Sequence, residues 1–255
     1  MRIQHNIMAM NANRNLTMNN TALSKNLEKL SSGYRINRAG DDAAGLAISE
    51  SMRGEIAVYD QAIRNANDGI SLIQTAEGAM TEVHSMLNRM ATLVTQGANE
   101  TYASGDKTKI NSELTALKAE IDRIETDTKF NGKDLFGKSF NFRVGESTNI
   151  STGSISKSGV TAVTATTAYA TVKGFIDTVS TARSALGAVQ NRLEHTVNNL
   201  GVTMENLQNA ESTIRDTNVA DEMMKYTKNN ILIQSAQAML AQANQVPQGV
   251  LQLMQ

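Results

Sequence analysis

The sequence predicts a mainly α-helical protein, an elongated antiparallel helical bundle or coiled-coil rod with a small β-hairpin and a domain of paired terminal helices. A single proline, Pro247, among 255 residues leaves almost the whole chain free to form helices. Two long stretches repeat apolar residues every seven positions, the period of a coiled-coil seam. Hydrophobic residues make up 40% and aromatic residues 4% of the chain, with no tryptophan, which is lean for a compact core.

Residues 1–38 are expected to form an amphipathic helical arm with few charges. Its apolar face carries Leu16, Leu23, Leu27 and Leu30. Asparagine is abundant in this segment, and its amide competes with helical hydrogen bonds, so the isolated arm has a low helix propensity. We therefore predict that the arm becomes ordered when it packs against a partner.

A long helix is predicted from about Ala43 to Gln96, with Asp41 or Asp42 at its N-cap. Its apolar residues recur every seven positions, at Met52, Tyr59, Ala66, Ile73, Met80, Leu87 and Val94. At about 1.5 Å per residue this helix is about 80 Å long, whereas a compact chain of this length is roughly 50 Å across. The helix does not fit such a sphere, so an elongated molecule is expected.

A turn over residues 97–106 precedes a third predicted helix. The apolar residues of this helix alternate four- and three-residue spacings, at Ile110, Leu114, Leu117, Ile121 and Ile124. The segment Phe130–Lys133 contains an Asn-Gly pair and predicts a turn.

A small β-hairpin is expected at about residues 139–170. Phe140, Phe142 and Val144 alternate with polar residues, a pattern typical of a strand. The segment Ser147–Thr171 is rich in serine, threonine, glycine and alanine, and it predicts a weak strand followed by an exposed loop.

The second seven-residue repeat predicts a long helix that begins near Thr171. Its seam residues are Val179, Leu186, Leu193, Leu200, Leu207 and Ile214. Gly187 and Gly201 weaken the helix locally, but no proline interrupts it. A seam of this length needs partners of similar length, and the helix predicted from Ala43 supplies one. We therefore expect the seam to hold one subunit together.

A polar break at residues 215–218 separates this helix from a C-terminal arm that carries no charge from Asn229 onward. The apolar residues expected to pack in this arm are Ile231, Leu240, Val246, Val250 and Leu253. Because the hairpin lies in the middle of the chain, the two ends of the chain meet and can pair. The prediction is a terminal domain of residues 1–42 with 219–255 and a second domain of residues 43–218.

A pair of terminal helices has too little core to be stable alone, because each helix exposes its remaining apolar face. Neighbouring copies of the chain can bury those faces, and identical copies joined by contacts that do not close make helical filaments. The sequence therefore predicts a self-assembling protein whose two arms order on polymerisation.

The composition excludes other classes of function. A net charge of −1 indicates no positive patch for binding nucleic acid. The sequence contains no run of about 18 apolar residues, so no membrane-spanning helix is predicted. Cysteine is absent, and His5, His84 and His195 share no ligand spacing, so no metal site is predicted. Without a phosphate loop or a nucleophile elbow, we expect no catalytic residue, no cofactor and no enzyme activity.

Two adjacent carboxylates, Asp41 and Asp42, could form a metal or acid–base site. Capping of an alanine-rich helix explains them better, because acids stabilise a helix N-terminus. Arg35 and Arg38 are close in sequence and are expected to pair with them at the joint between the two domains.

Four segments resemble the bacterial flagellin family, and the resemblance covers nearly the whole chain. These segments are Leu27–Ile48 (LEKLSSGYRINRAGDDAAGLAI), Phe142–Gly145 (FRVG), Asn209–Met224 (NAESTIRDTNVADEMM) and Ala241–Gln248 (AQANQVPQ). The resemblance implies a structural subunit of the flagellar filament, the propeller of swimming bacteria. Only the hairpin and its loop stand where many flagellins insert variable outer domains, so the chain resembles a minimal flagellin.

The resemblance also implies where the protein acts and with what. The terminal domain would line the central channel of an extracellular filament, and residues 43–218 would form the outer tube. The N-terminus lacks the apolar core of a signal peptide, which is consistent with type III export without a cleaved signal. An export chaperone, a filament cap and hook–filament junction proteins are the implied partners besides copies of the chain.

Family resemblance further implies recognition by an innate immune receptor. Leu87, Arg89, Leu93 and Glu113 match the family positions tied to that recognition, whereas Ala91 and Thr92 replace the usual Arg-Glu pair. The replacement removes two polar contacts.

Two alternatives remain open. A hook–filament junction protein or another secreted flagellar adaptor shares the terminal pattern but assembles in limited number. A lipid-surface helical bundle would use the uncharged C-terminal arm, although such helices usually carry lysine or arginine on their polar face.

Overall fold

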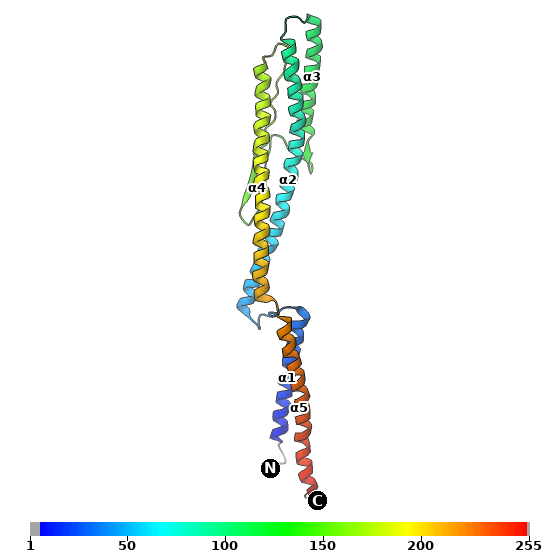
Figure 1. The fold of residues 1–255 in the computed structure, drawn as a ribbon, viewed down its shortest axis with the longest axis vertical. Helices are drawn as coiled ribbons and strands as arrows, with labels where there is room; N and C mark the ends of the chain where they lie inside the picture. Colours follow the sequence, from blue (N-terminus) through cyan, green and yellow to red (C-terminus); the bar gives the residue numbers. More distant parts are fainter. Residues whose placement is uncertain (1–5, 254–255) are drawn as a thin grey trace. The chain divides into compact units, whose positions relative to one another are not determined.

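The computed structural model describes residues 6–253, and the side chains of residues 6–245. Over this range the protein is mainly α-helical with small antiparallel strand pairs, which confirms the predicted fold class (Figure 1). The helices are α1 (Ile7–Ser32), α2 (Ala43–Gly97), α3 (Ser104–Asp127), α4 (Tyr169–Arg215) and α5 (Val219–Leu253). The strands are β1 (Lys129–Phe130), β2 (Lys133–Asp134), β3 (Ser139–Arg143) and β4 (Asn149–Ser154).

The chain forms two compact units. Unit 1 comprises Met1–Gly54 with Asn206–Gln255, and unit 2 comprises Glu55–Glu205. The borders between these units fall inside α2 and α4. The division expected from the sequence, at residues 42/43 and 218/219, concerns roles in assembly and stays a prediction.

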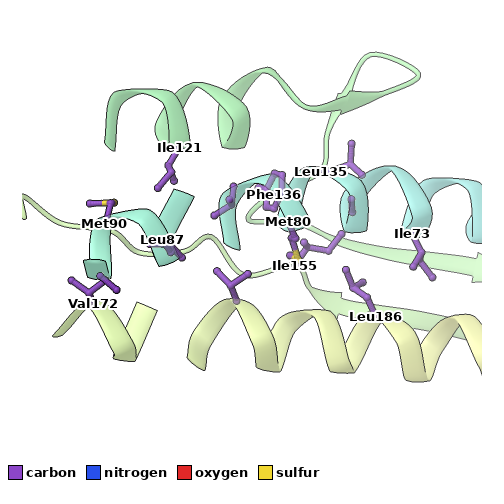
Figure 2. Packing of buried hydrophobic residues seen from close by; sticks show 14 of the residues in the cluster. Ile73, Met80, Leu87, Met90, Ile121, Leu135, Phe136, Ile155, Val172 and Leu186 are labelled. Atoms are coloured by element: carbon purple, nitrogen blue, oxygen red, sulfur yellow. The ribbon is translucent and has the colours of Figure 1, made fainter. Parts of the chain in front are cut away.

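Unit 2 contains a continuous hydrophobic core supplied by α2, α3, α4 and the strand region. Five positions of the predicted α2 repeat are buried there, namely Ala66, Ile73, Met80, Leu87 and Val94. Figure 2 shows Leu87 and Met90 from α2, Ile121 from α3 and Leu186 from α4 within this one cluster. Apolar side chains spaced at three and four residues therefore meet on facing helices, as ridge-into-groove packing requires.

The predicted α4 seam is buried along most of its length. Val179, Leu186, Leu193 and Leu200 are buried, while Leu207 and Ile214, which belong to unit 1, are half-buried. Three of the buried residues, Val179, Leu186 and Leu193, lie in the core cluster with the α2 repeat.

The turn predicted at Phe130–Lys133 is a tight β-hairpin between β1 and β2, a strand pair that the sequence did not predict. Asn131 and Gly132 have φ angles of 48° and 76°. Positive φ at both central residues is what a two-residue hairpin turn needs, and Asn-Gly supplies it at low cost. The second hairpin, between β3 and β4, ends at Ser154 rather than near residue 170.

The loop predicted after this hairpin is present, but it is only partly exposed. Ile155, Val163 and Ala165 are buried against the helices of unit 2. Two side chains of α3 take up backbone donors of this segment: the Glu125 carboxylate accepts from the Ser158 N–H at 2.6 Å, and Asn111 accepts from the Ala165 N–H at 2.6 Å. Small and polar residues are typical of loops. Here part of the segment packs along the helices, because side chains distant in the sequence accept the hydrogen bonds of its backbone N–H groups.

Candidate self-assembly surface

Helices α1 and α5 of unit 1 pack side by side as an antiparallel pair (Figure 1). Near one end of the pair, the Asn6 side-chain amide donates to the Ala243 carbonyl at 2.7 Å. The less exposed residues alternate three- and four-residue spacings, at Ala9, Ala12, Leu16, Asn19, Leu23, Asn26 and Leu30 in α1. The matching residues of α5 are Glu222, Tyr226, Asn229, Ile233, Ala236, Leu240 and Ala243. This spacing is that of a two-helix coiled coil, as predicted for the terminal arms.

The seam between α1 and α5 contains a buried polar layer. With its amide nitrogen facing α5, Asn26 donates to Glu222 Oε1 at 2.9 Å and accepts from the Asn229 side-chain amide at 3.0 Å. Glu222 is 3% exposed, and its carboxylate also pairs with Lys225 at 3.0 Å. Polar seam residues set the register of a coiled coil but cost stability, so this pair is weakly held.

Exposed large apolar side chains gather in unit 1, and all of them except Ile48 of α2 lie on α1 and α5. Among the described side chains, twelve of the fifteen exposed large hydrophobic residues belong to unit 1 and three to unit 2. The twelve are Ile7, Met8, Met10, Met18, Leu27, Ile48, Val219, Met223, Met224, Ile231, Leu232 and Met239. Apolar surface concentrated in this way marks a site of association with another molecule.

The arm residues predicted from the sequence divide into two groups. Leu16, Leu23, Leu30 and Leu240 are half-buried at seam positions, so they hold α1 and α5 to each other. Leu27 and Ile231 are 48% and 57% exposed and face away from the seam, where a second molecule can reach them. The predicted residues Val246, Val250 and Leu253 have side chains outside the described residues.

Six exposed methionines of unit 1 were not predicted from the sequence. Two of them, Met18 of α1 and Met239 of α5, line a groove of about 350 Å³ together with Leu232. The other lining residues are Asn15, Asn19, Ser235 and Ala236. These methionines could have been found by asking which apolar residues fall outside the three- and four-residue spacing of the seam. In a two-helix pair, such residues have no partner within the chain.

A short joint in unit 1 connects the end of α1, the beginning of α2 and the end of α4. Tyr34 and Asp216 form an antiparallel β-bridge. On either side of it, the Arg35 N–H donates to the Arg215 carbonyl at 2.7 Å, and the Thr217 N–H donates to the Gly33 carbonyl at 2.9 Å. These backbone hydrogen bonds fix where α1 ends relative to where α5 begins.

Arg215 is the central side chain of this joint. It was not among the joint residues predicted from the sequence. It is buried to 11% side-chain exposure, pairs with Glu50 of α2 at 2.5 Å and stacks over the Tyr34 ring at 4.7 Å. The hydrogen bond from Arg215 lowers the pKa of the Glu50 carboxyl, with a smaller coulombic contribution from the same guanidinium. One side chain therefore links three segments that are far apart in the sequence.

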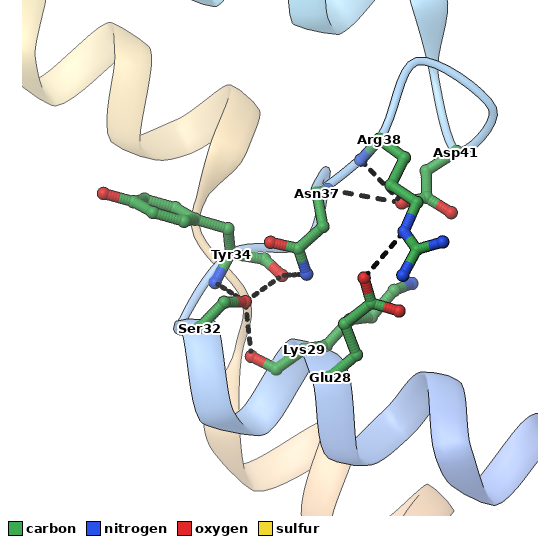
Figure 3. Close-up of polar contacts among 7 residues, drawn as sticks. All are labelled: Glu28, Lys29, Ser32, Tyr34, Asn37, Arg38 and Asp41. Carbon is green, nitrogen blue, oxygen red and sulfur yellow. Dashed lines mark hydrogen bonds and ion pairs between the residues drawn. The ribbon is translucent and has the colours of Figure 1, made fainter.

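The four predicted joint residues lie here, but the expected Arg–Asp ion pairs do not form among the described side chains. Arg38 pairs with Glu28 at 2.9 Å, and Arg35 donates to the Ile214 carbonyl (Figure 3 shows the Arg38 contacts). Asp41 accepts from the Arg38 N–H at 3.2 Å and from the Asn37 N–H at 3.3 Å. These two backbone hydrogen bonds, in that order, lower the pKa of the Asp41 carboxyl.

Asp42 is the N-cap of α2, as one of the two sequence alternatives held. Its carboxylate accepts from the Gly45 N–H at 2.9 Å, and its carbonyl accepts from the Leu46 N–H at 3.0 Å. A Cβ at position 45 would stand 2.5 Å from the Asp42 carboxylate and 2.8 Å from the Ile36 side chain. A larger residue at position 45 would therefore force the capping carboxylate of Asp42 and the Ile36 side chain to shift.

The receptor contact expected from resemblance meets a steric obstacle in unit 2. Leu87 and Leu93 are 0% and 2% exposed, because they belong to the hydrophobic core. Arg89 and Glu113 are exposed and paired with each other at 2.8 Å. Receptor recognition stays a prediction, and of the four residues only this ion pair is accessible to it.

Two classes of site are absent from the part of the chain that the structure describes. Within residues 6–253, none of the helices is both long and apolar enough to cross a bilayer. The same residues hold no group of three or more potential metal ligands.

Comparisons with known proteins converge on one family. The model described as "Bacterial flagellin N-terminal helical region" matches residues 3–141, and "Bacterial flagellin C-terminal helical region" matches residues 169–254. A protein of Halalkalibacterium halodurans called flagellin is 51% identical over 269 aligned residues, 99% of each chain. Flagellin of Bacillus subtilis is 47% identical over 303 aligned residues, 100% of each chain. The crystal structure of Bacillus cereus flagellin is 29% identical, with a TM-score of 0.48 over 54% of this chain and 88% of that one.

Proposed function

The chain belongs to the bacterial flagellin family, and from this we propose that it is a structural subunit that polymerises with copies of itself into the helical flagellar filament. Flagellin is a structural protein and not an enzyme. The observation that carries the proposal is the apolar outer surface of α1 and α5, which has no partner within the described chain. Burial of that surface between copies would stabilise two helices whose shared seam is partly polar.

We further propose that the two parts of the chain occupy different layers of the filament, as the family resemblance implies. Residues 1–42 and 219–255 would form the inner tube of the filament, and residues 43–218 the outer tube. Two observations support the assignment: the exposed apolar residues concentrate in unit 1, while unit 2 has a hydrophobic core of its own. A domain with its own core can form the outer tube before its ends find their partners.

The partners proposed beyond the homopolymer are a chaperone that binds the C-terminal arm, a filament cap and hook–filament junction proteins. The support for the chaperone is that α5 exposes Val219, Met223, Met224, Ile231 and Leu232, a surface that needs cover before assembly. Export of the chain through the flagellar type III apparatus, without a cleaved signal peptide, belongs to the same proposal.

Deletion of Val219–Gln255 tests the proposed function. The shortened chain is expected to keep the helical signal of unit 2 in circular dichroism, because the core cluster lies within residues 66–193. It should sediment as a monomer and fail to extend filament seeds. Polymerisation of the deletion at the rate of the full chain would contradict the proposal.

A point substitution sharpens the same test. Ile231→Asp places a charge on an exposed apolar residue, so the free subunit should fold as before while its polymerisation is lost. The matched control, Ile231→Val, keeps an apolar branched side chain and should polymerise. Electron microscopy of the control should show filaments of many subunits, which also separates a filament subunit from a junction protein that assembles in limited number.

A further inference from the structure

The apolar surface of unit 1 is chemically unusual because half of it is methionine. Six methionines there are between 46% and 69% exposed: Met8, Met10, Met18, Met223, Met224 and Met239. In unit 2, by contrast, Met80 and Met90 are 2% and 0% exposed, and Met86 and Met204 are half-buried. A thioether reacts with peroxides when solvent reaches it, so the two units differ in oxidant sensitivity as well as in burial.

Two of these methionines line one groove of unit 1, which is also lined by Asn15, Asn19 and Ser235. Met18 comes from α1, and Met239 comes from α5, with Leu232 beside it. The part of the groove formed by Met18, Leu232 and Met239 can receive an apolar side chain, and flexible methionines adapt their shape to what they contact. A polar oxygen added to either sulfur would stand in the path of that side chain.

We propose that these six methionines are an oxidation site at which hydrogen peroxide switches off the assembly of the free subunit. This inference rests on the proposed function, since it assumes that the apolar surface of unit 1 is buried between copies. A sulfur lone pair attacks one peroxide oxygen, the O–O bond breaks and an S–O bond forms. The departing hydroxide takes the proton from the oxygen now bound to sulfur and leaves as water. Each methionine is oxidised by two electrons, and one peroxide is reduced to water.

The sulfoxide acts through desolvation of its oxygen. Methionine sulfoxide carries a strong hydrogen-bond acceptor, and burying an acceptor without a donor is unfavourable. Addition of a subunit would bury six such oxygens, so the oxidised subunit stays in solution. Methionine sulfoxide reductases act on the two sulfoxide epimers and restore the thioether; a dithiol supplies the two electrons, becomes a disulfide, and the sulfoxide oxygen leaves as water, which makes the switch reversible.

The experiment compares the free full-length subunit with preassembled filaments, both exposed to hydrogen peroxide. Peptide mass spectrometry should find sulfoxide at the six exposed positions of the free subunit about tenfold faster than at Met80 and Met90. In filaments the six positions should be protected. The oxidised subunit should need an about tenfold or higher concentration to extend seeds, and treatment with both reductase types should return the original value.

A variant with all six methionines replaced by leucine isolates the cause. Leucine preserves the volume and apolar character of methionine, so this variant should extend seeds both before and after peroxide. A smaller variant, Met18→Leu with Met239→Leu, should keep part of that resistance and serves if the sixfold variant loses its circular-dichroism signal. The matched control is Met80→Leu with Met90→Leu, which should remain as sensitive to peroxide as the parent chain.

The outcomes separate this inference from the proposed function. Failure of the untreated parent chain to polymerise would contradict the proposed function. Polymerisation that persists after full sulfoxidation of the six positions would overturn only the oxidation site. Loss of assembly in the peroxide-treated sixfold leucine variant would also overturn it, because the effect would then come from other residues.

Discussion

Units 1 and 2 are built from helices with the same three- and four-residue spacing of seam positions, yet they differ in what fills those positions. Unit 2 places leucine, isoleucine, valine and methionine from three helices into one dry cluster. Unit 1 pairs two helices through a seam that includes Asn26, Asn229 and Glu222, and it leaves apolar residues outside.

This comparison teaches that periodicity fixes a helix and its facing side, whereas the number of neighbours fixes whether a unit is stable alone. A third helix lets apolar faces on both sides of α2 find cover in unit 2. In unit 1 the second face of each helix remains exposed, so its burial is left to another molecule.

The largest effect should come from a charge in the core of unit 2. Leu193 is fully buried, and Leu193→Asp removes its packing and buries a carboxylate, which should destabilise unit 2 by about 5 kcal/mol or more. Thermal melting followed by circular dichroism measures the loss. The control Asn191→Asp adds the same side chain at an exposed position of α4 and should stay within about 0.5 kcal/mol of the parent. Equal melting curves for the two variants would contradict the core assignment.

A smaller, local effect is expected in the seam of unit 1. Asn26→Ala removes the amide that joins Glu222 to Asn229 and should cost about 1–3 kcal/mol, because the buried Glu222 and the half-buried Asn229 lose a partner. Hydrogen exchange should speed up in α1 and α5, while the melting of unit 2 stays unchanged. Asn20→Ala, at an exposed position of the same helix, is the control. If Asn26→Ala slowed exchange in both helices, the polar layer would not be a stabilising contact.

The smallest effect should be a response of the unit 1 joint to acid. The folded pKa of Glu50 lies below its ordinary value of 4.5 because Arg215 donates to it. Its contribution to stability is therefore present above pH 4.5 and is lost as the pH falls through the lower folded pKa. Exchange of the Arg35 N–H, which is bonded to Arg215, should speed up on acidification. Glu50→Gln should remove this pH dependence, and a dependence that survives in the variant would assign it to another group.

Much of the fold was predictable because helices are set by local rules. The capping carboxylate of Asp42 placed the first residue of α2 correctly at Ala43, and the seven-residue repeat ended at Ile214, one residue before the observed end of α4 at Arg215. The Asn-Gly pair at Asn131 predicted a turn, since positive φ is a property of those residues. Spacing, capping and turn chemistry all act over a few residues, so the sequence displays them directly.

The assembly surface was predictable only in outline. The sequence indicated that the two arms pair and that some of their apolar residues remain exposed. It did not show that Leu23 is half-buried in the seam whereas Leu27 is exposed. That difference depends on the phase of α1 against α5, which no single helix determines. The exposed methionines were missed for the same reason.

The amino-acid sequence by itself determined the mainly helical fold, the long repeats and the family. Only the tertiary structure decided that residues after Ser154 pack along unit 2, that Arg215 joins Glu50 to Tyr34, and that Leu87 lies in the core. The physical reason is range: helix formation is decided by neighbours within one or two turns. Burial and polar partnership are decided by residues up to 237 positions apart, as for Asn6 and Ala243, and no local pattern encodes which of them meet.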